Sequence, residues 1–512
     1  MGMIKMKRFL SLVLAAVLLF TFCVPVFAAS KKCSCNMTPV VYIVGFGDSL
    51  YKDLDTDEPS SIFPPDGKAI AKSIPDLLVA VGCLLTGNKK GFGTFASRGA
   101  NLMLSDLACN IDGTAPANTG IEPMDPIVDT HKFPAFAPED GMDEGYFKFR
   151  YDWRLSPIDN AKFLKNFIDE VKTVTGHSEV VLAAHSQGNT VLTSYLQLYG
   201  SKGIEKIICL SPAFQGLSLV GSLFKREIDV SHKGDALEEY LRGIMGFETA
   251  QNKLIISVIS LINSYGVIDF ALNYLQKVLD SELEKVFDEC LIDVFGTMPG
   301  LWAFVPAEDY EDAKEIMFGD DEKYADIIKK TDYYCNKVQK KTVDILKKAK
   351  ANGTDIVIAA GYDISTIPVT SAEASHGDLL IDTEYMTLGA TCSSITETLG
   401  DGYKQAINSC GHNHISPENV IDASTCAFPE YTWFFRGNGH ADFGDEYCEF
   451  IEWAIRYDGQ PTVRISKNYP QFMAESEGKI SPATAKEAVD NRRDEDIIVT
   501  SLYEMIKDSA IK

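Results

Sequence analysis

The sequence predicts an α/β fold: a mostly parallel sheet with flanking helices and a helical cap or lid insertion. Two observations indicate this class. Short apolar runs rich in β-branched residues alternate with stretches of helical spacing, a pattern typical of a parallel sheet covered on both faces. A longer stretch, residues 215–350, has helical character and little strand signal. We therefore expect a sheet that is built from both halves of the chain and interrupted by helices.

The elements follow from the local patterns in chain order. The region 50–140 is rich in Pro, Gly, Asp and Asn, so mostly loop and short helix is expected there. Elsewhere apolar runs indicate strands, and apolar residues at helical spacing indicate helices. The expected strands are 39–44, 146–151, 179–184, 206–210, 355–360 and 431–435, and the expected helices of the core are 160–175 and 189–199.

The N-terminus has the pattern of a secretory signal peptide. Lys5, Lys7 and Arg8 precede an apolar run over residues 9–24, and Val26-Phe27-Ala28 supplies the small-residue end. This order predicts export with cleavage after Ala28; an uncleaved membrane anchor is the alternative. The chain is thus divided into a signal peptide at 1–28, a first core part at 29–214, the insertion at 215–350, a second core part at 351–460, and a C-terminal helical extension of unassigned role at 461–512.

Two segments outside the predicted core have sequence patterns that we interpret separately. Leu254–Leu275 is strongly apolar, which fits a buried helical hairpin in a cap or a lid whose apolar face meets lipid. Near the C-terminus, Ser481-Pro482 is typical of a helix N-cap followed by a proline in the first turn. We therefore expect a polar helix to follow through Val489.

The composition excludes some partners. The chain has 512 residues with 48 Lys and Arg against 72 Asp and Glu, a net charge of -24. Nucleic acid is therefore not an expected partner, because phosphate backbones are bound by Lys and Arg. Of the 12 cysteines, Cys23 lies in the signal peptide. The remaining odd number leaves at least one cysteine unpaired in an exported chain.

The segment around Ser186 carries the strongest chemical signal. Ala184-His185-Ser186-Gln187-Gly188 lies between an apolar strand and an amphipathic helix, and is a variant of the G-x-S-x-G nucleophile elbow. Small residues are needed at both ends because the strained turn brings strand and helix close together. Ser186 is therefore the expected nucleophile. The amide of Gln187, at the helix N-terminus, is expected to face a developing oxyanion.

A serine nucleophile needs a histidine base, which an acid holds in the correct tautomer. In α/β-hydrolases the order along the chain is nucleophile, acid, base. His440 follows the last expected strand, residues 431–435, and the glycine-containing loop 436–439. We expect it to be the base. His412 and His414, near Cys410, could suggest a metal, but two histidines in a polar loop are more typical of plain surface. No metal or cofactor is expected.

Spacing alone leaves three candidates for the acid, Asp363, Asp378 and Asp382. Asp363 is favoured on general grounds because it directly follows the strand expected at 355–360. Nothing else in the residues separates the three candidates.

Three further segments carry a resemblance. Tyr151-Asp152-Trp153-Arg154, Val44-Gly45-Phe46-Gly47 and the segment 210–216 resemble elements of the lecithin:cholesterol acyltransferase-like family, across residues 39–445. The resemblance implies an α/β-hydrolase fold acting on lipid esters, with the second oxyanion amide at Phe46. It also implies that the acid is Asp382, which lies where that family has a G-D-G-T-V-P-like loop, although the glycine and the proline are absent. The YDWR element is expected to be structural.

The leading hypothesis is a secreted serine ester hydrolase, a lipase, phospholipase or esterase, that uses Ser186, Asp382 and His440. A lipid or another ester is its expected substrate, with transient contact to lipid interfaces as an option. The alternatives are an O-acyltransferase with the same residues, an inactive α/β-hydrolase that binds lipid, and a peptidase. The sequence does not indicate an oligomeric state.

Overall fold

The computed structural model describes residues 35, 37–124, 127, 136–138, 145–245, 250–370, 375–476 and 478–485. The signal peptide expected at 1–28 lies outside these residues. Export and the cleavage position therefore remain predictions.

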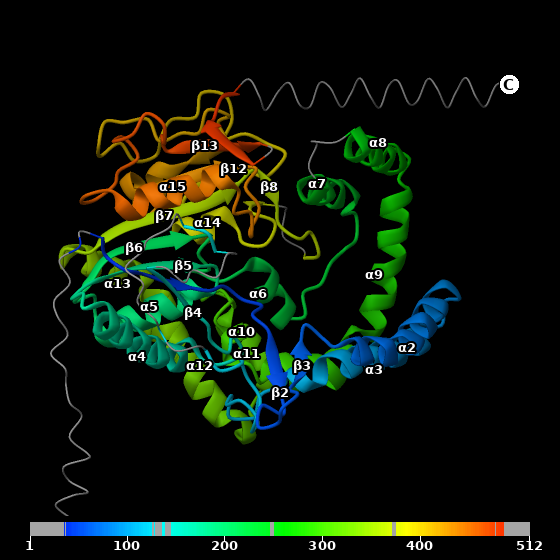
Figure 1. Cartoon of the computed structure of the whole chain (residues 1–512). Helices are drawn as coiled ribbons and strands as arrows, with labels where there is room; N and C mark the ends of the chain where they lie inside the picture. The colour runs from blue at the N-terminus through cyan, green and yellow to red at the C-terminus, as the bar shows by residue number, and fades with distance from the viewer. Residues whose placement is uncertain are drawn as a thin grey trace, which may run out of the picture.

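An eight-stranded sheet forms the centre of the molecule (Figure 1). Its order is β14-β13-β12-β7-β6-β5-β1-β4, and every neighbouring pair is parallel except β13 and β14. The predicted α/β class with a mostly parallel sheet is confirmed. The strands are β1 (Val40–Ile43), β4 (Tyr146–Phe149), β5 (Val180–His185), β6 (Ile204–Leu210), β7 (Asp355–Tyr362), β12 (Thr432–Arg436), β13 (Phe472–Ser476) and β14 (Lys479–Pro482).

Helices cover the sheet, which is why its central strands are apolar throughout. α4 (Pro157–Thr175) packs on α5 (Gly188–Tyr199), and α5 packs on α13 (Thr342–Ala351). α15 (Asp445–Arg456) contacts β6 and β14 instead. Every residue of β5 is buried, so the strand that leads to Ser186 lies in the middle of the core.

The chain between β6 and β7 is helical. It contains α6 (Ser218–Phe224), α7 (Gly234–Met245), α8 (Ala250–Ser264), α9 (Val267–Val286), α10 (Pro299–Trp302), α11 (Tyr310–Phe318), α12 (Ala325–Lys337) and α13. Part of this insertion stays close to the sheet, and a second hydrophobic cluster around Trp302 holds that part together.

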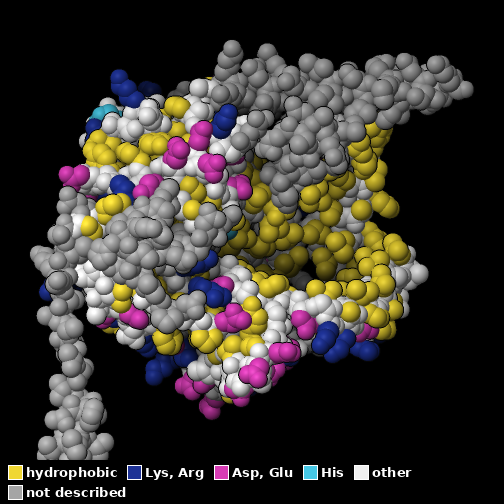
Figure 2. Space-filling view, in the orientation of Figure 1, with side chains coloured by type: hydrophobic (Ala, Val, Ile, Leu, Met, Phe, Trp, Pro, Cys, Tyr) yellow, Lys and Arg dark blue, Asp and Glu magenta, His cyan; other side chains and the backbone are white. Residues whose placement is uncertain are grey.

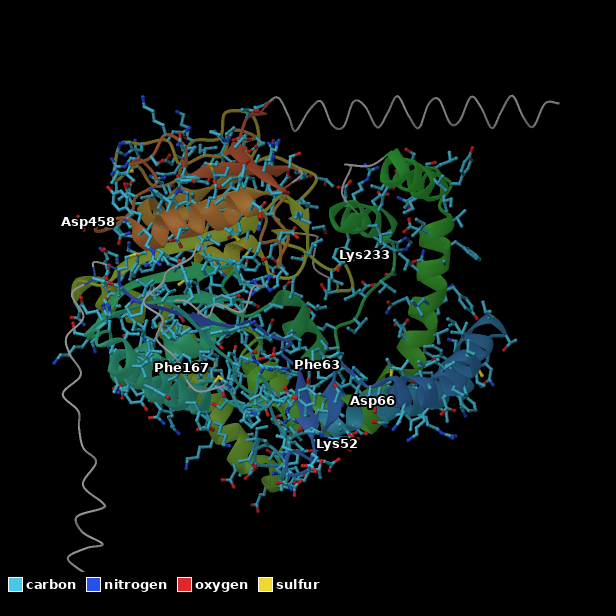
Figure 3. The ribbon with its side chains drawn as sticks, viewed as in Figure 1. Lys52, Phe63, Asp66, Phe167, Lys233 and Asp458 are labelled. Carbon is cyan, nitrogen blue, oxygen red and sulfur yellow. The ribbon has the colours of Figure 1, made fainter. Side chains whose placement is uncertain are left out.

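The expectation of mostly loop and short helix over residues 50–140 is wrong for residues 67–104 and fits the described residues 105–124. This region contains α2 (Gly67–Leu85) and α3 (Lys89–Leu104), two long helices that pack on each other. A small hairpin of β2 (Leu50–Lys52) and β3 (Ser60–Phe63) leads into them. Asp66 accepts a hydrogen bond from the Ala69 amide and caps α2; it lies near Phe63, where the helices leave the body (Figure 3).

Helices α2, α3, α8 and α9 project from the body, and we call them the arm (Figure 1). α3 contacts α9, which joins the two halves of the arm. Leu254–Leu275 lies in the arm. It is not the buried helical hairpin that was one of the two predictions for this segment, because Tyr265, Val267 and Phe270 are exposed. No single described helix is long and apolar enough to cross a membrane, although one bent pair, Ile256–Ser264 with Val267–Glu282, passes by length and composition.

The prediction of a helical extension at 461–512 is wrong for its first part. β13 and β14 lie within it and extend the central sheet beyond β12. Ser481 and Pro482 pair with Ala474 and Met473 in an antiparallel edge strand, where a proline is tolerated because it needs no ladder donor. The helix expected through Val489 lies mostly outside the described residues.

Short elements after β7 complete the fold. They are β8 (Ile364–Ser365), β9 (His376–Gly377), α14 (Thr383–Thr387), β10 (Thr391–Cys392) and β11 (Ile421–Asp422). β8 and β9 form a small antiparallel hairpin directly after β7. This hairpin determines where the acidic residues of the segment 363–382 lie.

Candidate active site

Ser186 occupies a strained turn between β5 and α5. Its φ of 51° is in the left-handed region, which costs on the order of 1 kcal/mol or more for a residue other than glycine. The surroundings hold the turn in place: the Ser186 amide donates to Leu210 O at 3.0 Å, and the Ala213 amide donates to Ser186 O at 3.3 Å. A Cβ on Gly188 would lie 2.5 Å from Ile43 O. The strand–turn–helix geometry of a nucleophile elbow is therefore present.

His440 lies between Ser186 and an aspartate. Its Nε2 is 2.9 Å from Ser186 Oγ, and its Nδ1 is 2.8 Å from Asp378 Oδ2. A carboxylate only accepts hydrogen bonds, so Nδ1 carries the proton and Nε2 presents a lone pair to the serine hydroxyl. The three side chains follow in the order serine, aspartate, histidine along the chain, which is the order of α/β-hydrolases.

The environment of Asp378 keeps its carboxyl group ionised. Its burial alone would raise the pKa, but His440 and the backbone N–H groups of Ile381 and Leu380 act the other way and hold the pKa below its usual value. Ile381 N donates to Asp378 Oδ1 at 2.8 Å and Leu380 N at 3.2 Å. Oδ1 is thus held by the backbone while Oδ2 faces His440.

The structure places Asp378 beside His440, and not Asp382, which was the expected acid. Asp382 accepts hydrogen bonds from Ser218 N, Ser218 Oγ and Ser375 Oγ at 3.1, 2.9 and 2.6 Å. It therefore joins α6 to the segment before α14, and among the described residues its carboxylate forms no hydrogen bond with His440. Asp363 lies beside His376 at the end of β7, with its Oδ1 3.8 Å from His376 Nδ1.

Two glycines explain the position of Asp378. A Cβ on Gly361 would lie 2.7 Å from Asp378 Cβ and 2.6 Å from Asn438 O, so the end of β7 lets the acid loop and the histidine loop meet. Gly377 directly precedes Asp378. The pair Gly377-Asp378 resembles the glycine–aspartate step of the G-D-G-T-V-P-like loop, and this similarity was the available sequence signal for Asp378.

His185, which directly precedes Ser186 in the turn, contacts the loop that carries His440. Its Nε2 is 2.8 Å from the backbone carbonyl oxygen of His440, and the two imidazole rings lie 5.0 Å apart. Burial, with a smaller effect of His440, lowers the pKa of His185 to about 3. The ring is therefore neutral at ordinary pH, and its Nε2–H donates to the loop that carries His440.

The first loop after β1 lies against the nucleophile turn. A Cβ on Gly45 would be 2.8 Å from His185 Nδ1 and 3.1 Å from Ser186 Cβ, so only glycine fits there. Among the described residues, the backbone N–H groups of Phe46 and Gln187 donate no hydrogen bond. Both predicted oxyanion amides thus lie in segments that adjoin Ser186.

The YDWR element holds this loop from the other side. Tyr151 Oη donates to Val44 O at 3.0 Å, and Trp153 Nε1 donates to Asp48 O at 2.9 Å. Arg150, just before the element, binds the Asp48 carboxylate through two nitrogens at 2.7 and 3.0 Å. The element therefore shapes the loop that contains Phe46.

The charged pair of the element is buried. Arg154 binds both oxygens of Asp152, at 2.7 and 3.0 Å, and has no exposed side-chain surface. Arg154 also donates to Leu107 O at 3.3 Å and to Thr119 Oγ1 at 3.2 Å. These contacts join the YDWR turn to the segment after α3.

Residues 141–223 match the family described as lecithin:cholesterol acyltransferase. The resemblance to that family is confirmed over this stretch, which contains the YDWR element and the nucleophile turn. No curated protein matches the chain. A chain of the solved structure titled "The crystal structure of Tle4-Tli4 complex" is similar with a TM-score of 0.24 and 13% identity, over 64% of this chain and 75% of that chain. The family match supports the interpretation of this protein as an enzyme that acts on acyl esters of lipids.

Proposed function

We propose that this protein is a serine hydrolase of lipid esters or other carboxylic esters. The observation that carries the proposal is the hydrogen-bonded series Ser186–His440–Asp378, with distances of 2.9 and 2.8 Å. Ser186 Oγ attacks the ester carbonyl while His440 Nε2 takes its proton. His440 then protonates the leaving alcohol, and Asp378 stabilises the imidazolium that forms in between. Water activated by His440 releases the acid from the acyl-enzyme.

The amides of Phe46 and Gln187 are the proposed donors to the oxyanion. Two observations support this proposal. Both segments lie beside Ser186, and among the described residues neither N–H group donates a hydrogen bond to an acceptor. Preorganised donors of this kind contribute ~3–4 kcal/mol each to stabilisation of the transition state.

Apolar surface next to the site favours an acyl chain as part of the substrate. The Phe46 ring is exposed and lies 4.4 Å from the Trp153 ring, with Phe63 and Phe304 around it at 6.1 and 6.0 Å. Beyond this group, hydrophobic side chains line the hollow between the body and the arm (Figure 2). A contiguous apolar patch of this kind is typical of a surface that binds lipid or an apolar ligand.

We also propose that the protein is exported. The support is the order of basic, apolar and small residues within 1–28. N-terminal sequencing of the protein recovered from the medium tests it: a mature start at Ala29 is expected, and retention of Met1 in the exported protein would contradict cleavage.

Release of p-nitrophenolate from acyl esters of increasing chain length tests the activity. Turnover that increases with chain length is expected, together with a loss of roughly 10⁴-fold or more in Ser186→Ala. Ser211→Ala is the matched control, because Ser211 follows the neighbouring strand β6, is also buried, and has no place in the series. Equal activity in Ser186→Ala would refute the mechanism. A folded protein that neither turns over esters nor reacts with a fluorophosphonate probe would support the inactive lipid-binding alternative.

Acyl transfer is the second candidate, and the family match favours it. The same acyl-enzyme would then be released by an alcohol instead of water. Addition of a long-chain alcohol to the ester assay separates the two: an ester product that accumulates in preference to the free acid supports transfer. Free acid alone supports hydrolysis.

A further inference from the structure

A cluster of potential metal ligands lies where the long loop between β10 and β11 meets the segment before β12. Residues 393–420 contain no helix or strand, and loops of this length need internal contacts to stay ordered. His412 is partly exposed, as the sequence reading expected, but His414 is only 1% exposed and is not a surface residue. The buried imidazole requires partners, and the loop and the segment before β12 supply them.

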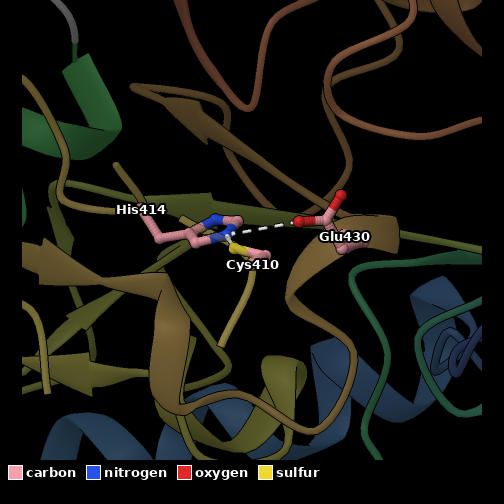
Figure 4. Close-up of side chains that lie close together, drawn as sticks. All are labelled: Cys410, His414 and Glu430. Atoms are coloured by element: carbon pink, nitrogen blue, oxygen red, sulfur yellow. Dashed lines mark hydrogen bonds and ion pairs between the residues drawn. The ribbon is translucent and has the colours of Figure 1, made fainter. Parts of the chain in front are cut away.

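Three side chains of different chemistry converge there (Figure 4). Cys410 Sγ lies 3.0 Å from His414 Nε2, and Glu430 Oε1 lies 3.4 Å from the same nitrogen. The three ligand atoms are all within 4.8 Å of one another. Zn–N and Zn–O bonds of ~2.0 Å and Zn–S bonds of ~2.3 Å place tetrahedral ligand atoms roughly 3.3–3.6 Å apart, so small shifts would accommodate an ion.

Gln471 determines which nitrogen of His414 can bind a cation. The Gln471 amide nitrogen donates to Pro429 O at 2.8 Å and to Thr432 O at 3.2 Å, so its Oε1 is the acceptor. This oxygen lies 2.6 Å from His414 Nδ1, which therefore carries the proton. Nε2 then presents a lone pair towards Cys410 and Glu430. A donor on the far ring nitrogen is the usual outer-shell arrangement of metal-binding histidines.

Glu430 is also held in place by its outer oxygen. Arg464 donates to Glu430 Oε2 from two nitrogens, at 2.6 and 2.7 Å. Glu430 Oε1 is buried and accepts no hydrogen bond from any described residue. The Cys410 thiol can donate its hydrogen to His414 Nε2, which leaves the buried carboxylate oxygen without a donor, an unfavourable state. A cation between the three atoms would be bound by all of them and would remove this deficit.

We propose that Cys410, His414 and Glu430 bind a zinc ion, with a fourth position open to water. One thiolate, one imidazole and one carboxylate form a ligand set that suits Zn²⁺. The Cys410 thiol loses its proton to solvent when the ion binds. The ion joins the loop 393–420 to the segment that enters β12, the strand that leads to His440. Its role is structural, since the ligands take no part in the Ser186–His440–Asp378 series.

Metal content and thermal unfolding of the purified, untagged chain test this proposal. After treatment with EDTA and addition of zinc chloride, about one zinc per chain is expected by mass spectrometry of the metal. The Tm is expected to rise by roughly 5 °C at a hundredfold excess over Kd. In Cys410→Ser and His414→Gln both effects are lost. Cobalt substitution should produce a thiolate-to-metal charge-transfer band that is absent from Cys410→Ser.

Matched variants separate this site from incidental metal binding. His412→Gln removes the neighbouring histidine, whose Nε2 accepts from Arg464 at 2.9 Å, and should keep the zinc. Cys83→Ser removes a thiol of α2 and should keep it too. Zinc bound equally by all variants would be adventitious and would overturn the proposal. Wild-type protein that binds no zinc would also overturn it.

Discussion

Asp378 Oδ2 lies 2.8 Å from His440 Nδ1, although 62 residues separate the two in the chain. The hairpin of β8 and β9 turns the chain back after β7 and places Asp378 at the C-terminal edge of the sheet. Asp382 is only four residues further on, yet its carboxylate binds Ser218 and Ser375. Two neighbouring aspartates therefore have separable roles.

Asp378→Asn should abolish most activity, and Asp382→Asn should not. An asparagine at 378 can present its amide nitrogen to Nδ1 and select the wrong tautomer of His440, so a fall in kcat of ~10⁴-fold is expected. Asp382→Asn keeps an acceptor for Ser218 and should retain kcat within about tenfold. Ester turnover of both variants beside the parent protein measures this. The reverse order would restore Asp382 as the acid.

A part of the fold could be predicted from sequence where its sequence pattern is local and strong. β5 and Ser186 could be predicted because an apolar strand, small residues and a helix occur within a few positions. The position of Asp378 beside His440 could not be predicted. Asp378 lies 16 residues after the end of β7, and a hairpin of two strands, each only two residues long, determines where it lies. β13 is short, and β14 is an exposed edge strand with a proline, so neither has a strong strand pattern. The length of α2 could not be predicted because Pro75 lies inside the helix, and a proline usually indicates a helix end.

His185 should act as a positioning residue for His440. His185→Leu removes the donor to the His440 carbonyl, and we expect kcat to fall ~10-fold because the base moves out of line, with KM nearly unchanged. His185→Gln keeps an N–H of similar reach and should recover part of the loss. Steady-state kinetics of the two variants measure this split. Equal losses in both, or a change in KM alone, would indicate a role in packing only.

His185 should also make stability depend on pH. Its pKa of about 3 in the folded protein lies below the usual ~6.5 of the unfolded chain. The unfolded state therefore binds more protons between these values, and the free energy of unfolding falls as the pH drops through that window. From pH 7 to pH 5 the contribution of this one residue is about 2 kcal/mol.

Urea unfolding of the parent protein and His185→Leu at both pH values isolates this contribution. The decrease between pH 7 and pH 5 should be smaller in the variant. Asp378 does not interfere, since its pKa is below the usual carboxyl value and its stabilisation is lost only at more acidic pH. Identical decreases in the two proteins would mean that His185 is not neutral when buried.

Gly45→Ala should reduce activity while the fold is retained. The added Cβ would lie 2.8 Å from His185 Nδ1 and 3.1 Å from Ser186 Cβ, so the loop carrying Phe46 must move away from the nucleophile. Displacement of one oxyanion donor costs ~10²–10³-fold in kcat. Gly82→Ala is the matched control, because no atom lies within 4 Å of its added Cβ in α2 and alanine favours a helix by ~1 kcal/mol. Circular dichroism and ester turnover of both variants test this. Full activity in a folded Gly45→Ala protein would show that the loop after β1 does not contribute to the oxyanion site.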